Sequence, residues 1–238
     1  EQKNQENWFS SHVSFQAVKR FYYPLKSTEA VGASMDGRST SLLELPGDGD
    51  LKEVQVKLVD AGFWKGFQFA FVDGKPFSQA DFDSGLRKAV ISRTMARQLF
   101  GETPPVGRTF VLDSDEYRVC GVVKDVSFIT PATYADIWLP LTVDADIIKD
   151  NKGGYELVGD LNVYMLAPSV DAKDKVISEV RDVFRKYNYS QKKYSADLHG
   201  QPVSYWKSIF YEYSSSAPDW GELLRVYGTI LLALLFVP

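Results

Sequence analysis

Between residues 51 and 125, short apolar runs alternate with turn signals, and this alternation restricts the fold more than any other feature of the chain. The runs KEVQVKLV, KAVIS, RTFVL and EYRVCGVV are short and rich in valine and other strand-forming residues. The tripeptide DSD between the last two runs predicts a hairpin turn. Ser92 is expected to cap the helix RTMARQLF, and Gly101 to end it in the left-handed conformation. Short strands, tight turns and one small helix predict a compact α+β unit.

The stretch FVDGKPFSQADF, which begins at Phe71, predicts a turn and then a single helical turn. Ser78 is expected to be the N-cap, with Asp81 facing the positive end of that helical turn. In the following helix, we expect Met95, Leu99 and Phe100 to lie on one face.

The remaining segments predict two longer helices and further strands. Residues 8–23 carry apolar side chains at four-residue spacing, so a helix is expected there that ends at Pro24. EAVGAS and LNVYMLA are expected strands, STSLLEL and KEVQVKLV an expected hairpin, and residues 142–159 a loop. In KEVQVKLV, alternation predicts a half-buried strand with Gln55 and Lys57 facing water. The clearest helix spans residues 169–188, and its predicted apolar face consists of Val176, Ile177, Val180, Val183, Phe184 and Tyr187.

Nearly every residue after Gly228 is apolar, in the run TILLALLFVP. The run is shorter than the roughly 20 residues that span a bilayer. Trp220, Arg225 and Tyr227 precede it and belong to the residue types that collect at a membrane–water interface. We expect residues 226–238 to be the start of a truncated transmembrane helix, with these three residues at the interface. The alternative is a buried C-terminal helix of a soluble domain.

The composition and motifs give little support to catalysis or nucleic-acid binding. The net charge is −4 and no basic stripe is visible, so nucleic acid is not an expected partner. Cys120 is the single cysteine and is most simply a small core residue. The chain has no phosphate loop, no H-E-x-x-H or C-x-x-C motif, and only His12 and His199 as histidines. Two other functional classes remain as alternatives: a secreted or periplasmic hydrolase with dispersed site residues, and a soluble ligand-binding module.

Four pieces of the sequence, taken in order, resemble the periplasmic core domain of MacB/FtsX-like ABC transporter permeases. They are VDAGFWKGFQFAFVDGKPFSQADF, KAVISRTMARQLFG, PPVGRTF and YRVCGVVKDV. The positions that carry the resemblance are Gly74, Phe77, Asp81, Ala96, Leu99, Phe100, Gly101, Gly107, Gly121, Val122 and Asp125. The resemblance implies that these residues form turns, caps and core of a rigid lobe, and that none of them is catalytic.

The resemblance also implies two lobes. A discontinuous, porter-like lobe near the membrane is expected from residues 1–59 and 141–225, with an inserted, β-rich, sabre-like lobe from residues 60–140. The whole protein would lie in the bacterial cytoplasmic membrane with this domain facing the periplasm. It would transmit ATP-driven conformational change, for efflux, export or mechanotransmission, without enzymatic activity, cofactor or metal of its own. The implied partners are a cytoplasmic ATPase subunit or domain that handles ATP, a second permease copy, and a periplasmic adaptor, lipoprotein or cell-wall hydrolase.

Overall fold

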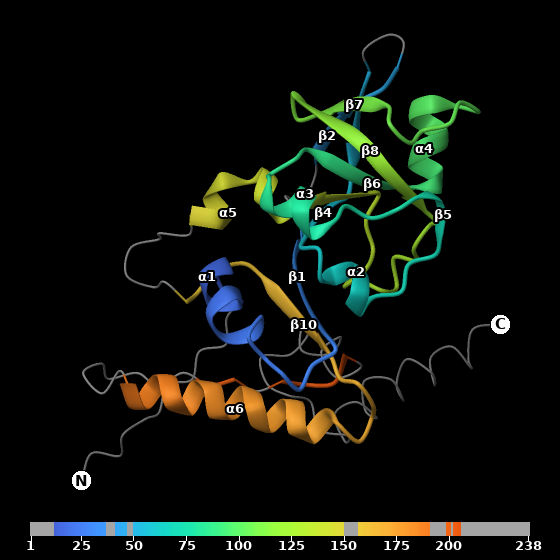
Figure 1. The fold of residues 1–238 in the computed structure, drawn as a ribbon. Coiled ribbons are helices and arrows are strands. Elements are labelled where there is room, and N and C mark those ends of the chain that lie inside the picture. Colours follow the sequence, from blue (N-terminus) through green and yellow to red (C-terminus); the bar gives the residue numbers. More distant parts are fainter. Residues whose placement is uncertain are drawn as a thin grey trace, which may run out of the picture. The chain divides into compact units, whose positions relative to one another are not determined.

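The fold is seen in a computed structural model, which describes residues 12–36, 41–46, 50–149, 157–190, 199–200 and 202–205 (Figure 1). The contacts divide the chain into two compact units, residues 1–198 and residues 199–238. The elements below all belong to the first unit.

Ten strands of the described residues pair in one mixed sheet in the order β10-β1-β4-β9-β6-β8-β7-β2-β3, with β5 paired to β8. The pairs β4–β9 and β6–β8 are parallel, and the others are antiparallel. The strands are β1 (Ala30–Asp36), β2 (Ser41–Glu44), β3 (Leu51–Val54), β4 (Val56–Val59), β5 (Phe71–Gly74), β6 (Lys88–Ser92), β7 (Thr109–Leu112), β8 (Asp115–Val123), β9 (Ile137–Pro140) and β10 (Asn162–Leu166).

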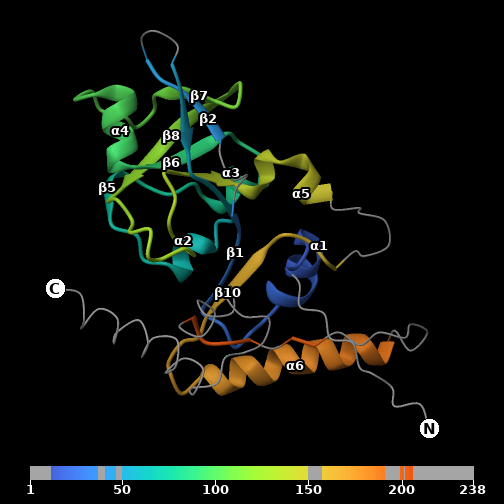
Figure 2. The same ribbon diagram turned by 180° about the vertical axis from the view of Figure 1, so that it is seen from behind.

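Helices lie along and between these strands. The first is a short α-helix that continues as a π-helix, and α6 packs against it; both views show α6 next to this region and to β10 (Figures 1 and 2). The helical elements are α1 (Phe15–Ala17), η1 (Val18–Tyr22, π), α2 (Phe63–Gly66), α3 (Gln79–Asp83), α4 (Arg93–Phe100), η2 (Leu141–Val143, 3-10), α5 (Ala145–Lys149) and α6 (Lys173–Ser190). The predicted α+β class is confirmed.

Several local predictions are confirmed by backbone geometry. The Ser92 hydroxyl accepts a hydrogen bond from the Met95 amide at 3.1 Å and caps α4. Asp113 and Ser114, with φ of 50° and 70°, form the two-residue turn between β7 and β8. Positive φ at both positions matches the twist of paired strands. Gly101 has the expected positive φ of 59°, but its ψ of −125° is not that of a left-handed helix.

Three local predictions are wrong. Lys57 is buried, at 2% exposure, because all four residues of β4 are buried and neither face of this strand is open to water. The first described helix begins at Phe15 and becomes a π-helix at Val18, whereas residues 1–11 lie outside the described residues. The predicted loop after Leu141 contains η2 and α5, and the Asp144 carboxylate accepts a hydrogen bond from the Asp146 amide at 2.9 Å, at the start of α5.

The strands of the two expected lobes belong to the same sheet. From the expected inserted lobe, β9 pairs with β4 and continues the sheet formed by β4, β1 and β10. The boundaries near residues 59 and 141 therefore remain a prediction.

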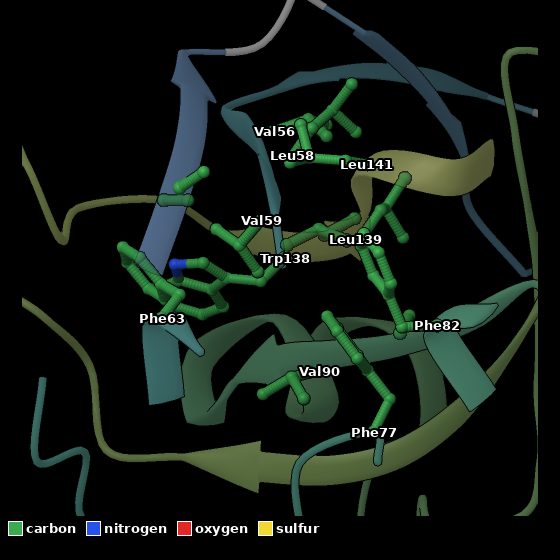
Figure 3. Close-up of a cluster of buried hydrophobic side chains, with 14 of the residues drawn as sticks. Val56, Leu58, Val59, Phe63, Phe77, Phe82, Val90, Trp138, Leu139 and Leu141 are labelled. Carbon is green, nitrogen blue, oxygen red and sulfur yellow. The ribbon is translucent and has the colours of Figure 1, made fainter. Parts of the chain in front are cut away.

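The core lies where the central strands meet α2 and α3. Figure 3 shows Trp138 of β9 beside Val59 and Phe63, all with no solvent exposure. The Trp138 ring lies 5.5 Å from the ring of Phe69, and its indole N–H donates to the carbonyl oxygen of Thr133 at 3.2 Å. A large buried aromatic side chain thus joins the sheet to the segment that follows α2.

Candidate functional site: the contact of the first helical segment with the sheet

The described residues contain no group of three or more His, Cys, Asp and Glu side chains placed to hold a metal ion. One shallow depression of about 230 Å³ lies between the end of β2, the end of α4 and β7. Its volume is below the 300–1,000 Å³ typical of small-molecule sites. The two histidines, His12 and His199, are exposed.

Cys120 is half-buried in β8, where its Sγ lies 3.3 Å from the carbonyl oxygen of Ala89. Burial raises the pKa of its thiol to about 11, so the reactive thiolate is scarce at neutral pH. These observations agree with its interpretation as a core residue.

Asp81 joins α3 to β6. One of its oxygens accepts from the amide and the hydroxyl of Ser78, both at 2.9 Å, and the Ser78 hydroxyl accepts from the Asp81 amide, which completes a capping box. The other oxygen accepts from the Lys88 ammonium at 2.7 Å. Mainly because of this bond to Lys88, the pKa of Asp81 falls to about 2.

Replacing Asp81 by Asn should lower the melting temperature at pH 7, because it removes the ion pair and weakens a cap worth about 1 kcal/mol. A carboxyl whose folded pKa is lowered stabilises the fold above its unfolded pKa, and this contribution is lost as the pH falls through the folded pKa of about 2. The variant should therefore lose less stability than the wild type between pH 5 and pH 2. Thermal unfolding followed by circular dichroism at several pH values in this range measures the loss of stability. Asp83→Asn in the same helix is the control, and an equal acid loss in all three proteins would contradict the prediction.

The other positions of the sequence motif lie around α4, β5 and β8. The Asp125 carboxylate accepts from the Thr94 amide at 2.9 Å and so joins the end of β8 to the first turn of α4. A Cβ on Gly74 would lie 2.3 Å from the carbonyl oxygen of Cys120, and one on Gly121 would lie 2.7 Å from that of Lys75. Glycines at both positions thus let β5 and β8 approach closely.

The apolar motif residues line the same region. Phe77, Ala96, Leu99 and Val122 are buried, and Phe100 is half-buried. The Gly107 amide donates to the carbonyl oxygen of Val119 at 2.8 Å. That these positions have no catalytic role stays a prediction.

The polar contact with the least expected chemistry is at Asp60, in the connection between β4 and α2. Its side chain is 1% exposed, yet the described donors to it are neutral. The Tyr23 hydroxyl donates to one oxygen at 2.7 Å, and the Phe63 amide donates to the other at 2.7 Å. Burial outweighs these bonds and raises the pKa of the Asp60 carboxyl. Burial of the Tyr23 hydroxyl and the charge of Asp60 together raise the pKa of Tyr23 well above its usual range.

A second contact supports this junction. The ring of Phe15 in α1 lies 6.4 Å from that of Tyr23 and 6.1 Å from that of Phe82 in α3. The first helical segment, residues 15–23, therefore contacts the connection at Asp60 and the helix α3. We call this set of contacts, made by Phe15, Tyr23, Asp60, Phe63 and Phe82, the junction.

Sequence reasoning did not single out Asp60. The available signal was the pattern VKLVDAGF, in which an acidic residue follows an apolar strand and stands three positions before an aromatic residue. That pattern predicts a cap at most. The contact with Tyr23 spans 37 positions in sequence, and no local pattern reports it.

One more surface stands out on the loop between β8 and β9. Phe128 and Ile129 are adjacent and are 78% and 73% exposed. The loop is held by hydrogen bonds from the amide and the hydroxyl of Thr130 to the carbonyl oxygen of Ser127, at 3.1 and 2.7 Å. Large apolar side chains on a loop held in this way are typical of protein contact surfaces.

The expected membrane-interface residues Trp220, Arg225 and Tyr227, and the expected helix start at 226–238, lie outside the described residues. Within the described part of the chain, no helix combines the length and the apolar character that crossing a bilayer requires.

The fold is that of extracytoplasmic domains of ABC transporter permeases. The extracellular domain of the transporter YknZ from Gram-positive bacteria superposes with a TM-score of 0.54 at 18% identity, over 79% of this chain and 89% of that one. A domain of a putative permease from Porphyromonas gingivalis gives 0.54 at 18% identity, over 92% and 91% of the two chains. The periplasmic region of MacB from Actinobacillus actinomycetemcomitans gives 0.53 at 12% identity, over 73% and 75%.

Sequence comparison gives the family. The chain is 24% identical over 91 residues to the uncharacterized ABC transporter permease YknZ of Bacillus subtilis, a match over 38% of this chain and 23% of that protein. The sequence profile of the MacB-like periplasmic core domain matches residues 6–183. The chain therefore belongs to this family and is a periplasmic domain of an ABC transporter permease of the MacB type, as the motif series predicts.

Proposed function

We propose that this domain transmits ATP-driven conformational change from the membrane to a periplasmic substrate or partner, and that it has no catalytic activity of its own. ATP would be handled by a cytoplasmic ATPase subunit or domain, and two permease copies would act together. The observation that carries the proposal is that residues 15–23 are held on two sides, so a displacement of this segment moves the rest of the domain with it.

On one side, the junction holds the segment against α2 and α3. On the other side, Phe21 lies 5.1 Å from the rings of both Phe184 and Tyr187 in α6, and the Arg20 guanidinium lies over Tyr187 at 4.8 Å. Aromatic and cation–π contacts of this kind each add stabilisation beyond the burial of area.

The turn after the segment is fixed as well. The Glu179 carboxylate of α6 accepts hydrogen bonds from the amides of Lys26 and Ser27, at 3.0 and 2.9 Å, and from the Ser27 hydroxyl. These bonds lower the pKa of Glu179 against the opposing effect of its partial burial. Bonds to an ionised carboxylate are stronger than bonds between neutral groups. The chain is thus tied to α6 directly before β1 begins.

The proposal places the domain on the periplasmic side of the bacterial cytoplasmic membrane. Its work would be efflux, export or mechanotransmission, through an adaptor, a lipoprotein or a cell-wall hydrolase. The exposed pair Phe128 and Ile129 supports action through protein contacts. Among the described residues, no observation favours the hydrolase or the ligand-binding module.

Spin labels on the intact transporter test the proposal. A spin label on a cysteine that replaces the exposed Ser84, in a Cys120→Ser background, gives one distance between the two permease copies by pulsed electron paramagnetic resonance. Trapping ATP on the ATPase should shift this distance, because the domain moves as a body. A second pair, at Ser84 and exposed Arg181 of one copy, should keep its distance. The control is an ATPase variant that binds no nucleotide. An unchanged distance between copies would rule out transmission, and a missing signal would rule out the dimer.

A further inference from the structure

Asp60 makes hydrogen bonds to two different helical elements. Its carboxyl group accepts from the amide of Phe63, the first residue of α2, and from the hydroxyl of Tyr23, which directly follows η1. Its own amide donates to the carbonyl oxygen of Ala33 in β1 at 3.0 Å. One residue therefore connects the N-terminal segment, a strand of the sheet and α2.

Satisfying the first amide of α2 would not by itself require a buried carboxyl group. Capping α2 uses one side-chain oxygen, and a serine or asparagine supplies one as well. A buried carboxyl group is costly unless each of its oxygens has a hydrogen-bond partner, and for one of the two oxygens that partner is the Tyr23 hydroxyl. Loss of this donor leaves the oxygen unsatisfied and weakens the group that accepts from the first amide of α2.

Displacement of α2 would disturb the packing of the core. Phe63 and Phe67 of this connection pack on Tyr164 of β10, at 6.1 and 4.9 Å between ring centres. Trp64 lies 6.3 Å from Trp138 of β9. The backbone of α2 also lies directly against β1, where Gly32 and Gly62 leave no room for a Cβ. Contacts of α2 therefore reach three strands of the sheet.

We propose that Tyr23 is a positioning residue that couples the first helical segment to α2: its bond to Asp60 makes the opening of α2 depend on the position of residues 15–23. The coupling is a property of the isolated domain, and its use in transport rests on the proposed function. Tyr23 suits this role because its hydroxyl reaches Asp60 at 2.7 Å, while the residue itself is 38% exposed and lies at the edge of the core.

Hydrogen exchange of this chain, followed by mass spectrometry, tests the coupling. Tyr23→Phe removes only the hydroxyl. The amides of Phe63, Lys65, Gly66 and Phe67 should then exchange about tenfold faster, as expected for loss of one buried hydrogen bond. Tyr22→Phe is the matched control: it removes the same group from the neighbouring, buried tyrosine, whose hydroxyl makes no hydrogen bond to the described residues. It should leave α2 unchanged.

The double variant separates coupling from plain destabilisation. In an Asp60→Asn background, Tyr23→Phe should add much less to the exchange of α2, because the asparagine has one acceptor oxygen for the two donors that Asp60 serves. Faster exchange spread evenly over all strands, equal effects in both backgrounds, or no effect of Tyr23→Phe on α2 would each overturn the proposal. This experiment uses the domain without ATPase or membrane. A negative result would therefore not decide whether the domain transmits conformational change, which the spin-label experiment tests separately.

Discussion

Replacing Gly62 by alanine is expected to destabilise the domain by about 3 kcal/mol or more, at the upper end of what overpacking costs. A Cβ at this position would lie 1.9 Å from the carbonyl oxygen of Val31 and 2.9 Å from its carbonyl carbon. Both atoms belong to the backbone of β1, so they cannot turn aside as a flexible side chain can. Either α2 must lift from the sheet or β1 must bend. Denaturant unfolding followed by circular dichroism measures the loss.

Gly66, the last residue of α2, is the matched control. A Cβ there would meet no atom within 4 Å. Gly66→Ala should be neutral or stabilising by up to about 1 kcal/mol, because alanine loses less backbone entropy than glycine in a helix. Two alanines four positions apart thus have opposite expected signs. Wild-type stability in Gly62→Ala would mean that α2 does not lie against β1 as described.

The features that could be predicted from the sequence are those whose cause is local. Ser92 caps α4 because its hydroxyl lies next to the first free amides of the helix. The DSD turn, the capping box at Ser78 and the strand KAVIS likewise depend on residues a few positions apart. The resemblance to the family also rests on local turns and caps, which follow one another in a fixed order along the chain.

The features that could not be predicted depend on the order of strands in the sheet. Alternation with Val56 and Leu58 predicts that Lys57 faces water, but all four residues of β4 are buried, so both faces of this strand are covered. The parallel pairing of β4 with β9 joins positions about 80 residues apart, as Val56 and Ile137 show. The junction also depends on tertiary packing, because Tyr23, the partner of Asp60, lies 37 positions away in the sequence. The sequence signals a capping carboxylate there and does not signal that Tyr23 reaches it.

Replacing Trp138 by alanine is expected to cost about 4 kcal/mol and to leave the domain close to unfolding, because typical domains have only about 5–15 kcal/mol of stability. Trp138 has no exposed surface and lies in β9, between β4 and β6. Its removal opens a cavity at the point where α2, the sheet and the segment at Phe69 meet (Figure 3), and leaves the carbonyl oxygen of Thr133 without the indole donor. The surroundings have little freedom to fill such a cavity, because Val59 and Phe63 are themselves fully buried.

Two further variants locate the cause of that loss. Trp138→Phe keeps most of the ring volume but removes the N–H donor, so it should cost clearly less than alanine, about 1–3 kcal/mol for an unsatisfied carbonyl and a smaller cavity. Phe128→Ala removes an aromatic ring that is 78% exposed, and it should stay within about 0.5 kcal/mol of the wild type. The denaturant midpoints of the three variants should rise in the order Trp138→Ala, Trp138→Phe, Phe128→Ala. If Phe128→Ala were as damaging as Trp138→Ala, the loop between β8 and β9 would have to be part of the core, and its exposed pair could not serve as a contact surface.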